Sequence, residues 1–146
     1  MSKSNAWETG LQSLTFNNDD FAGIGDTAGL QGAGTVGSLY VSLHNADPGE
    51  AGTQATNESV YTDYGRVAVA RTDTAWTVSA GAVSNAEAVS FTVSGATGDT
   101  LTYFGVGTAS AGAGILLYSG ALTASLTVSA GITPAFAIGE LDVTEE

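Results

Sequence analysis

Apolar and polar residues alternate along much of the chain from residue 38 onwards, which is the pattern of half-buried β-strands. The alternation is clearest at Leu39, Val41 and Leu43, and it returns at Val67 and Val69. Turn-forming residues separate such runs at intervals of about 8–12 residues. This spacing predicts an all-β fold, an antiparallel sandwich or barrel of eight or nine short strands. The remaining strands are predicted at residues 76–78, 83, 89–93, 101–107, 115–118, 122–128 and 136–143.

The N-terminal segment has a helical pattern instead. Trp7, Leu11 and Leu14 fall on one face at helical spacing. Asn5 is the predicted N-cap, and we expect the helix to end near residues 17–18. A helix this short is marginal in water, so its apolar face is expected to dock on another surface.

Glycine and aspartate interrupt residues 19–37, and this stretch is predicted to be a loop or an extended arm. Phe21 and Leu30 are apolar anchors within it. A segment of this length without regular structure either wraps its own domain or reaches a neighbour. The sequence therefore divides into an N-terminal helix and glycine-rich arm at residues 1–37 and a β-sandwich domain at residues 38–146.

The charge of the chain narrows the choice of partners. Its 146 residues include 15 acids and 3 Lys or Arg, for a formal net charge of −12. Nucleic acids and anionic membranes attract basic surfaces, so neither is an expected partner. Arg66 and Arg71 bracket a predicted strand and point to opposite faces. Each is expected to pair with a carboxylate, either of the same chain or of a second copy.

Candidate chemistry is sparse. The chain has no Cys, which excludes disulfides, thiolate nucleophiles and Cys-based zinc sites. His44 is the only histidine, and Asp47 and Glu50 follow it. A general-base role would also need a nucleophile and an oxyanion site. No serine lies in a G-x-S-x-G elbow, so His44 is interpreted as a surface or packing residue at a strand end.

Ligand motifs are equally weak. Asp19, Asp20 and Asp26 offer oxygen ligands for calcium in a glycine-rich loop, but their spacing matches no EF-hand. Two Gly-x-Gly segments, at residues 23–25 and 105–107, lack the further residues of a phosphate-binding loop. No catalytic residue, metal ligand or cofactor is predicted.

Exposed aromatic and apolar residues are the remaining candidates for partner contacts. Tyr61 and Tyr64 flank Asp63 ahead of a predicted strand and are expected to form an exposed pair. The alternative is that aromatic residues such as these pack in the core. The full set of predicted partner-binding residues is Trp7, Leu11, Leu14, Phe21, Leu30, Tyr61, Tyr64, Arg66 and Arg71.

Several ordered motifs resemble one family. Residues 39–50, LYVSLHNADPGE, resemble a segment of small structural proteins of tailed bacteriophages that typically reads L-Y-x-x-L-H-T-A-D-P. Residues 64–69 are similar to the Y-x-R-V-x-V strand of the same proteins. Later landmarks lie at residues 76–78, 85–86, 104–107 and 131–136, and the resemblance runs from about Asn5 to the C-terminus.

The resemblance implies a virion structural protein that is made in the host cytoplasm and brings no catalytic residues. Such proteins are loosely labelled tail-fibre or virion proteins. A chain of 146 residues is short for a fibre shaft, and its acidity suits the outer surface of the head. The resemblance therefore favours a capsid decoration, or cement, protein that binds the major capsid protein and copies of itself as a homotrimer.

Two other functions are weighed against decoration. A tail-fibre or tail-tip adhesion module would bind a host receptor or a sugar through exposed aromatic residues. An enzyme such as a depolymerase would need a carboxylate pair or a metal site in a cleft. The sequence singles out neither feature, so we expect a protein that is not an enzyme.

Overall fold

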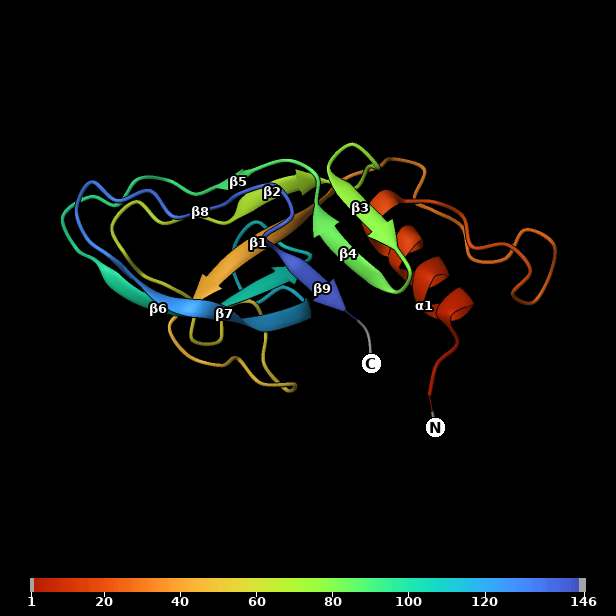
Figure 1. Ribbon diagram of the computed structural model, residues 1–146, viewed down its shortest axis with the longest axis horizontal. Coiled ribbons are helices and arrows are strands. Elements are labelled where there is room, and N and C mark those ends of the chain that lie inside the picture. The colour runs from red at the N-terminus through yellow and green to blue at the C-terminus, as the bar shows by residue number, and fades with distance from the viewer. Residues whose placement is uncertain (1, 145–146) are drawn as a thin grey trace. The chain divides into compact units, whose positions relative to one another are not determined.

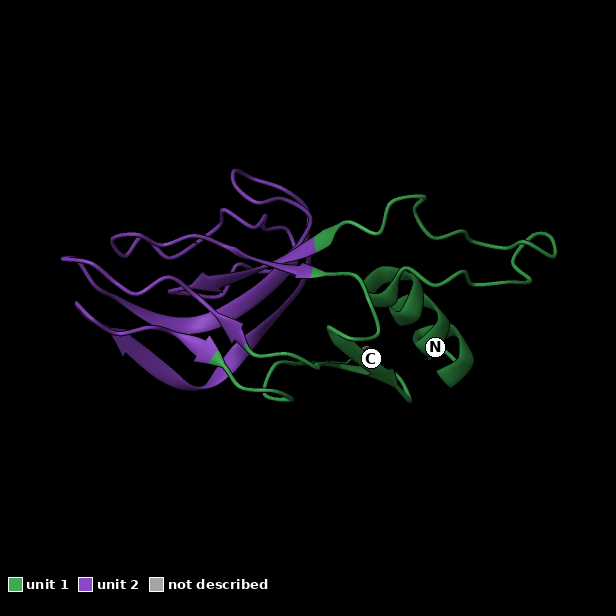
Figure 2. Cartoon of the chain, turned by 90° about the horizontal axis from the view of Figure 1, so that it is seen from above, with its two compact units in different colours: residues 1–38, 70–88, 136–146 green, residues 39–69, 89–135 purple. Residues whose placement is uncertain are grey.

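The computed structural model describes residues 2–144 of the chain. Met1, Glu145 and Glu146, which belong to the ends of the two predicted parts, lie outside the described residues. The chain forms two compact units (Figure 2). Unit 1 contains residues 1–38, 70–88 and 136–146, and unit 2 contains residues 39–69 and 89–135. The division into residues 1–37 and 38–146 remains a prediction.

The predicted fold class is confirmed. Residues 2–144 contain nine strands and a short N-terminal helix, and the paired strands form open antiparallel sheets in a sandwich-like fold. The sheet orders are β2-β1-β6-β7, β3-β4-β9 and β5-β8 (Figure 1). The strands are β1 Ser38–His44, β2 Val67–Ala70, β3 Trp76–Ser79, β4 Ala82–Asn85, β5 Val89–Ser90, β6 Asp99–Gly107, β7 Leu116–Val128, β8 Ala135–Phe136 and β9 Asp142–Thr144.

The helix of unit 1 is capped one residue earlier than predicted. Helix α1 spans Asn5–Gln12, and Ser4 is its N-cap because the Ser4 hydroxyl accepts the Trp7 N–H at 3.3 Å. The helix continues as a π-helical turn, η1, over Ser13–Asn17. It ends at Asn18 in the left-handed conformation, which confirms the predicted end. None of the helices in residues 2–144 has the length and apolarity that a bilayer crossing requires.

The side chains that the helix buries differ from the predicted stripe. Phe16 and Gln12 are fully buried, whereas Trp7 is 39% exposed. The Phe16 ring meets the Trp76 ring edge-on at 4.9 Å, and Gln12 Nε2 donates to the Gly81 carbonyl at 2.8 Å. Gln12 and Phe16 lie four positions apart and share one face of the helix, and this face begins one residue after Leu11 of the predicted stripe. Helix α1 and the turn η1 therefore pack on β3 and β4, which Figure 1 shows beside α1.

A tight hairpin joins these two strands. Ala80 and Gly81 both have positive φ, 52° and 80°, as a two-residue turn of type I′ requires. The turn predicted at this Ala-Gly pair is confirmed. Asn85 on β4 is almost fully buried, and its amide donates to the Ala137 carbonyl and accepts the Leu141 N–H. One side chain thus fixes the segment that leads into β9.

Residues 19–37 form a loop, as predicted, and the loop closes on itself. Phe21 and Leu30 exchange two backbone hydrogen bonds of 2.8 and 2.9 Å as an antiparallel bridge. The side-chain amide of Asn18 accepts the Ala33 N–H at 2.7 Å and donates to the Ala33 carbonyl at 2.9 Å. The loop is therefore closed by a backbone bridge and by the Asn18 side chain, neither of which its sequence pattern reveals.

The largest sheet of unit 2 has β1 and β6 at its centre. The two strands are antiparallel, with Val41 opposite Val106 and His44 opposite Tyr103. Val41, Leu43, Leu101 and Val106 are at most 2% exposed, and they form the core of the sheet. The strand predicted from the alternation at residues 39–43 is confirmed.

The strand β7 differs from the prediction of two separate strands at residues 115–118 and 122–128. It runs unbroken from Leu116 to Val128. Its pairing with β6 shifts between Leu101↔Leu126 and Tyr103↔Ala121, a step of two residues on β6 against five on β7. The expected gap is therefore a bulge at residues 122–125, where the chain stays extended but loses register.

The contact of Phe16 with Trp76 is expected to hold the helix in place. Phe16→Ala should destabilise the protein by about 3–5 kcal/mol, because it opens a cavity in the core of unit 1. The measurement is urea unfolding followed by tryptophan fluorescence. Ile138→Ala, at a side chain in the same unit that is 68% exposed, is the control and should change the stability by about 0.5 kcal/mol or less. Equal losses for the two variants would contradict this packing.

Candidate functional site

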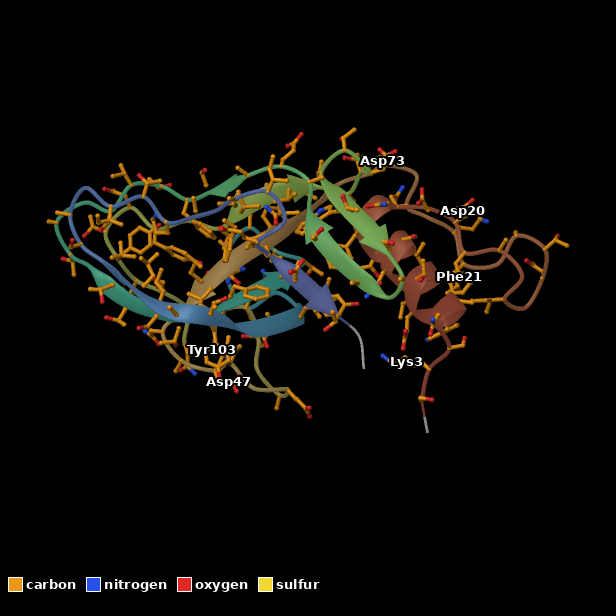
Figure 3. The ribbon with its side chains drawn as sticks, viewed as in Figure 1. Lys3, Asp20, Phe21, Asp47, Asp73 and Tyr103 are labelled. Atoms are coloured by element: carbon orange, nitrogen blue, oxygen red, sulfur yellow. The ribbon has the colours of Figure 1, made fainter. Side chains whose placement is uncertain are left out.

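The structure brings three of the predicted partner-binding residues together on unit 1. The Trp7 and Phe21 rings lie 5.6 Å apart, and Leu30 is the bridge partner of Phe21. Trp7 is 39% and Leu30 36% exposed. We call Trp7, Phe21 and Leu30 the apolar patch. Figure 3 labels Phe21 at the base of the loop beside α1.

A glycine makes the apolar patch possible. A Cβ atom at Gly10 would lie 2.5 Å from the Phe21 ring. Gly in a helix costs about 1 kcal/mol relative to Ala. The absence of a side chain at Gly10 lets the Phe21 ring lie against α1, next to Trp7.

Arg71 binds the C-terminal end of the helix instead of a carboxylate. Its guanidinium donates to the Thr15 carbonyl at 2.7 Å and to the Leu14 carbonyl at 2.5 Å. These carbonyls belong to the last turn, where cations are favourable. Leu11 and Leu14 themselves are half-buried. The expected carboxylate partner of Arg71 is therefore replaced by backbone carbonyls of its own unit.

The prediction that Tyr61 and Tyr64 form an exposed pair is wrong. Tyr61 is 2% exposed, and its hydroxyl donates to the Thr92 carbonyl at 2.9 Å. Tyr64 is half-buried, and its ring meets the Tyr61 ring edge-on at 5.2 Å. Its hydroxyl donates to Glu58 at 2.9 Å and accepts the Leu43 N–H at 3.1 Å. Both phenols find polar partners within unit 2, which permits their burial.

Arg66 pairs with a carboxylate of its own chain, which is one of the two alternatives that the sequence left open. Its guanidinium binds both carboxylate oxygens of Glu58, at 2.6 and 2.7 Å. It also donates to the carbonyls of Ala109 and Gly112, at 2.8 and 2.6 Å. The Arg66 and Glu58 side chains are 2% and 17% exposed, and the hydrogen bonds that Arg66 donates to Glu58 raise the pKa of Arg66. Glu58 was not among the predicted site residues, because it lies in a loop without a pattern.

His44 is a buried packing residue, one of the two roles predicted for it. It is 0% exposed, and its Nδ1 donates to the Thr56 carbonyl at 2.9 Å. Its Nε2 therefore accepts from the Ser42 hydroxyl, 2.9 Å away. Burial lowers the pKa of His44. Gly105 lies opposite Ser42, and a Cβ there would come within 2.8 Å of Nε2. The Ser42–His44 pair is thus enclosed within unit 2.

The aspartates weighed as calcium ligands bind the backbone of their own loop. Asp20 Oδ1 accepts the Gly32 N–H at 2.8 Å. Asp26 Oδ1 accepts the N–H groups of Ala28 and Gly29, at 2.9 and 3.0 Å. Within residues 2–144, no group of three or more His, Asp or Glu side chains is placed to hold a metal ion.

Comparison with known proteins places the chain in a phage family. Residues 29–144 match the family model described as Podophage GP4 fiber I protein gp80. The chain belongs to this family. The expected kinship with structural proteins of tailed bacteriophages is thereby confirmed, and the family is one of fibre-type virion proteins. Trp7, Leu11, Leu14 and Phe21 precede the matched residues, whereas Leu30 lies within them. A search of curated proteins finds no match.

Removal of the Glu58 carboxylate should destabilise unit 2 strongly. Glu58→Gln leaves the covered Arg66 guanidinium without its counter-charge, and breaking a buried pair costs about 3–5 kcal/mol. Glu50→Gln, the same change at an exposed site, serves as the control and should be nearly neutral. Urea unfolding of both variants tests this prediction, and a loss below about 1 kcal/mol in Glu58→Gln would show that the pair is dispensable.

His44 should make the stability pH-dependent. Its folded pKa is below the ordinary value of 6.5, so the unfolded chain binds more protons near that pH. The stability that His44 contributes is present above about pH 6.5 and is lost as the pH falls toward the lowered folded pKa. Between about pH 8 and about pH 5, the wild type should lose more stability than His44→Gln. Equal changes in the urea midpoints of the two proteins would exclude this role.

Proposed function

We propose that the protein is a structural component of a phage fibre, that it acts through contacts with other virion proteins, and that it is not an enzyme. The observation that carries the proposal is the match of residues 29–144 to the fibre family. The burial of the single histidine, with both ring nitrogens hydrogen-bonded inside the protein, supports a role without catalysis.

The apolar patch is the proposed docking surface of unit 1. Trp7 and Leu30 are exposed, large and apolar, the kind of side chain that supplies binding energy in protein interfaces. The Phe21–Leu30 bridge and the Asn18 amide hold the loop before any partner binds. A surface held in this way loses less conformational entropy on binding.

The proposed partners are fibre proteins and copies of this chain, including a homotrimer. The net charge of −12 argues against nucleic acid and anionic membranes as partners. Decoration of the head through the major capsid protein is the second candidate, and the same acidity favours it, because an acidic protein is repelled by the packaged DNA. Adhesion to a host receptor would be compatible with a fibre location.

Loss of the apolar patch should keep the protein folded but prevent its incorporation into virions. Trp7→Ser/Leu30→Ser removes two exposed apolar contacts, so the urea midpoint should shift little. Virions assembled with this variant should carry at least roughly ten-fold less of the protein, because each interface anchor contributes about 1 kcal/mol or more. Immunoblots of purified particles provide the measurement.

The control for that experiment is Val60→Ser/Ile138→Ser, which removes two apolar residues that are 77% and 68% exposed elsewhere. The control variant should be incorporated like the wild type. If the Trp7 and Leu30 variant is also incorporated normally, the apolar patch is not the docking surface.

A further inference from the structure

Carboxylates border the apolar patch on the loop that carries it. Asp20 directly precedes Phe21, and its Oδ1 accepts the N–H of Gly32, two residues after Leu30, at 2.8 Å. Figure 3 labels Asp20 and Phe21 on the same loop beside α1. One exposed carboxylate is thus bound across the two arms of the loop that contribute Phe21 and Leu30 to the patch.

Two further aspartates of the loop are held by backbone contacts. Asp26 Oδ1 accepts the N–H of Gly29, the residue before Leu30, at 3.0 Å. The Asp19 N–H donates to the Ser13 carbonyl at 3.2 Å, which fixes Asp19 at the end of η1. Both side chains are exposed. A carboxylate that accepts a backbone N–H through one oxygen keeps a second oxygen for the donor of a partner. The acidic border of the patch consists of Asp19, Asp20 and Asp26.

The acidic border acts on any protein that covers the apolar patch. In 0.15 M salt, charges are screened over about 8 Å. The carboxylates of Asp20 and Asp26 lie closer than this to the backbone of the patch, because they bind N–H groups one or two residues from it. Unit 1 supplies two cations, Lys3 and Arg71, and Arg71 binds the carbonyls at the helix end. The border therefore carries an excess of negative charge.

We propose that the apolar patch binds a different virion protein, through a segment in which apolar residues are flanked by Lys or Arg, and that these cations pair with the acidic border. Apolar side chains of the segment cover Trp7, Phe21 and Leu30, and an Arg can stack on the exposed part of the Trp7 ring. Interfaces combine an apolar centre with a polar rim, and complementary charges favour the correct partner. This inference rests on the proposed function, because it names the partner chemistry of the same surface.

The charge of the chain argues against a second copy as the occupant of the patch. A second copy has a net charge of −12, and its three cations include Arg66 and Arg71, which bind groups of their own chain. In a two-fold contact the acidic borders of both copies would also approach each other. Like charges placed opposite each other suppress such pairing. Copies of this chain would then associate through other surfaces.

A competition for places in the virion tests the charge of the border. A phage without its own copy of the gene is grown in cells that supply the wild-type chain and a variant in equal amounts, each with a different epitope tag. Asp19→Asn/Asp20→Asn/Asp26→Asn removes the three charges and keeps the oxygens that accept the N–H groups of the loop. Immunoblots of purified virions should show a roughly five-fold excess of the wild type, the effect of three exposed charge pairs. Equal amounts of the two chains would overturn the inference.

The matched control is Asp73→Asn/Glu87→Gln/Asp142→Asn, which makes the same charge change at exposed positions of unit 1. This variant should be incorporated as well as the wild type. Depletion of both variants to the same extent would mean that net charge alone matters, and the border would lose its assignment. Urea midpoints close to that of the wild type should show that both variants keep the fold. If the border variant is less stable than the control, a cross-linking experiment with intact carboxylates decides instead.

Photo-cross-linking in virions identifies the occupant. The probe is p-benzoylphenylalanine in place of Trp7, which keeps an aromatic ring in the patch. The expected product joins position 7 to a different virion protein, at a segment with more Lys and Arg than Asp and Glu. A product with a second copy of this chain, a product with a segment that lacks net positive charge, or no product although immunoblots detect the chain in the particles, overturns the inference. Absence of the wild-type chain from the particles overturns the proposed function itself.

Discussion

The arrangement of unit 2 depends on the contacts of the buried Arg66 guanidinium. It binds the Glu58 carboxylate and the carbonyls of Ala109 and Gly112. Three segments distant in sequence thereby converge on one charge: the loop after β1, the start of β2 and the turn between β6 and β7. The turn sets where β7 begins. The buried positive charge of Arg66 is tolerated because the Glu58 carboxylate neutralises it and the two carbonyls accept its remaining hydrogen bonds.

Gly105 and Gly107 of β6 leave room for buried polar side chains where strands approach each other. The Gln54 amide binds the Tyr40 carbonyl and the Ala109 N–H, and a Cβ at Gly107 would lie 2.2 Å from its Cδ. Gly105 likewise leaves room for His44, because a Cβ there would lie 2.8 Å from its Nε2. At these two positions a larger residue would displace a buried polar side chain from its hydrogen bonds.

The sequence predicted those parts that depend on local patterns. The alternation at Leu39–Leu43 located β1, and the Ala80-Gly81 pair located the hairpin. Local sequence patterns did not predict contacts between residues that are distant in the sequence. Nothing near Arg66 indicates the carbonyl of Gly112, 46 positions away, and the burial of Tyr61 follows from partners such as Thr92. The buried face of the helix includes Gln12, a polar residue that is buried because its amide donates to the Gly81 carbonyl, and a search for apolar positions does not find such a residue.

The account describes a fibre-family protein whose proposed docking surface is the apolar patch on unit 1. Its central claim is the location in the fibre. The most direct measurement is immunogold labelling of this protein on purified virions, viewed by electron microscopy. The account predicts gold particles on the fibres. Label spread over the head would contradict it in favour of capsid decoration, and virions without label would contradict any virion role.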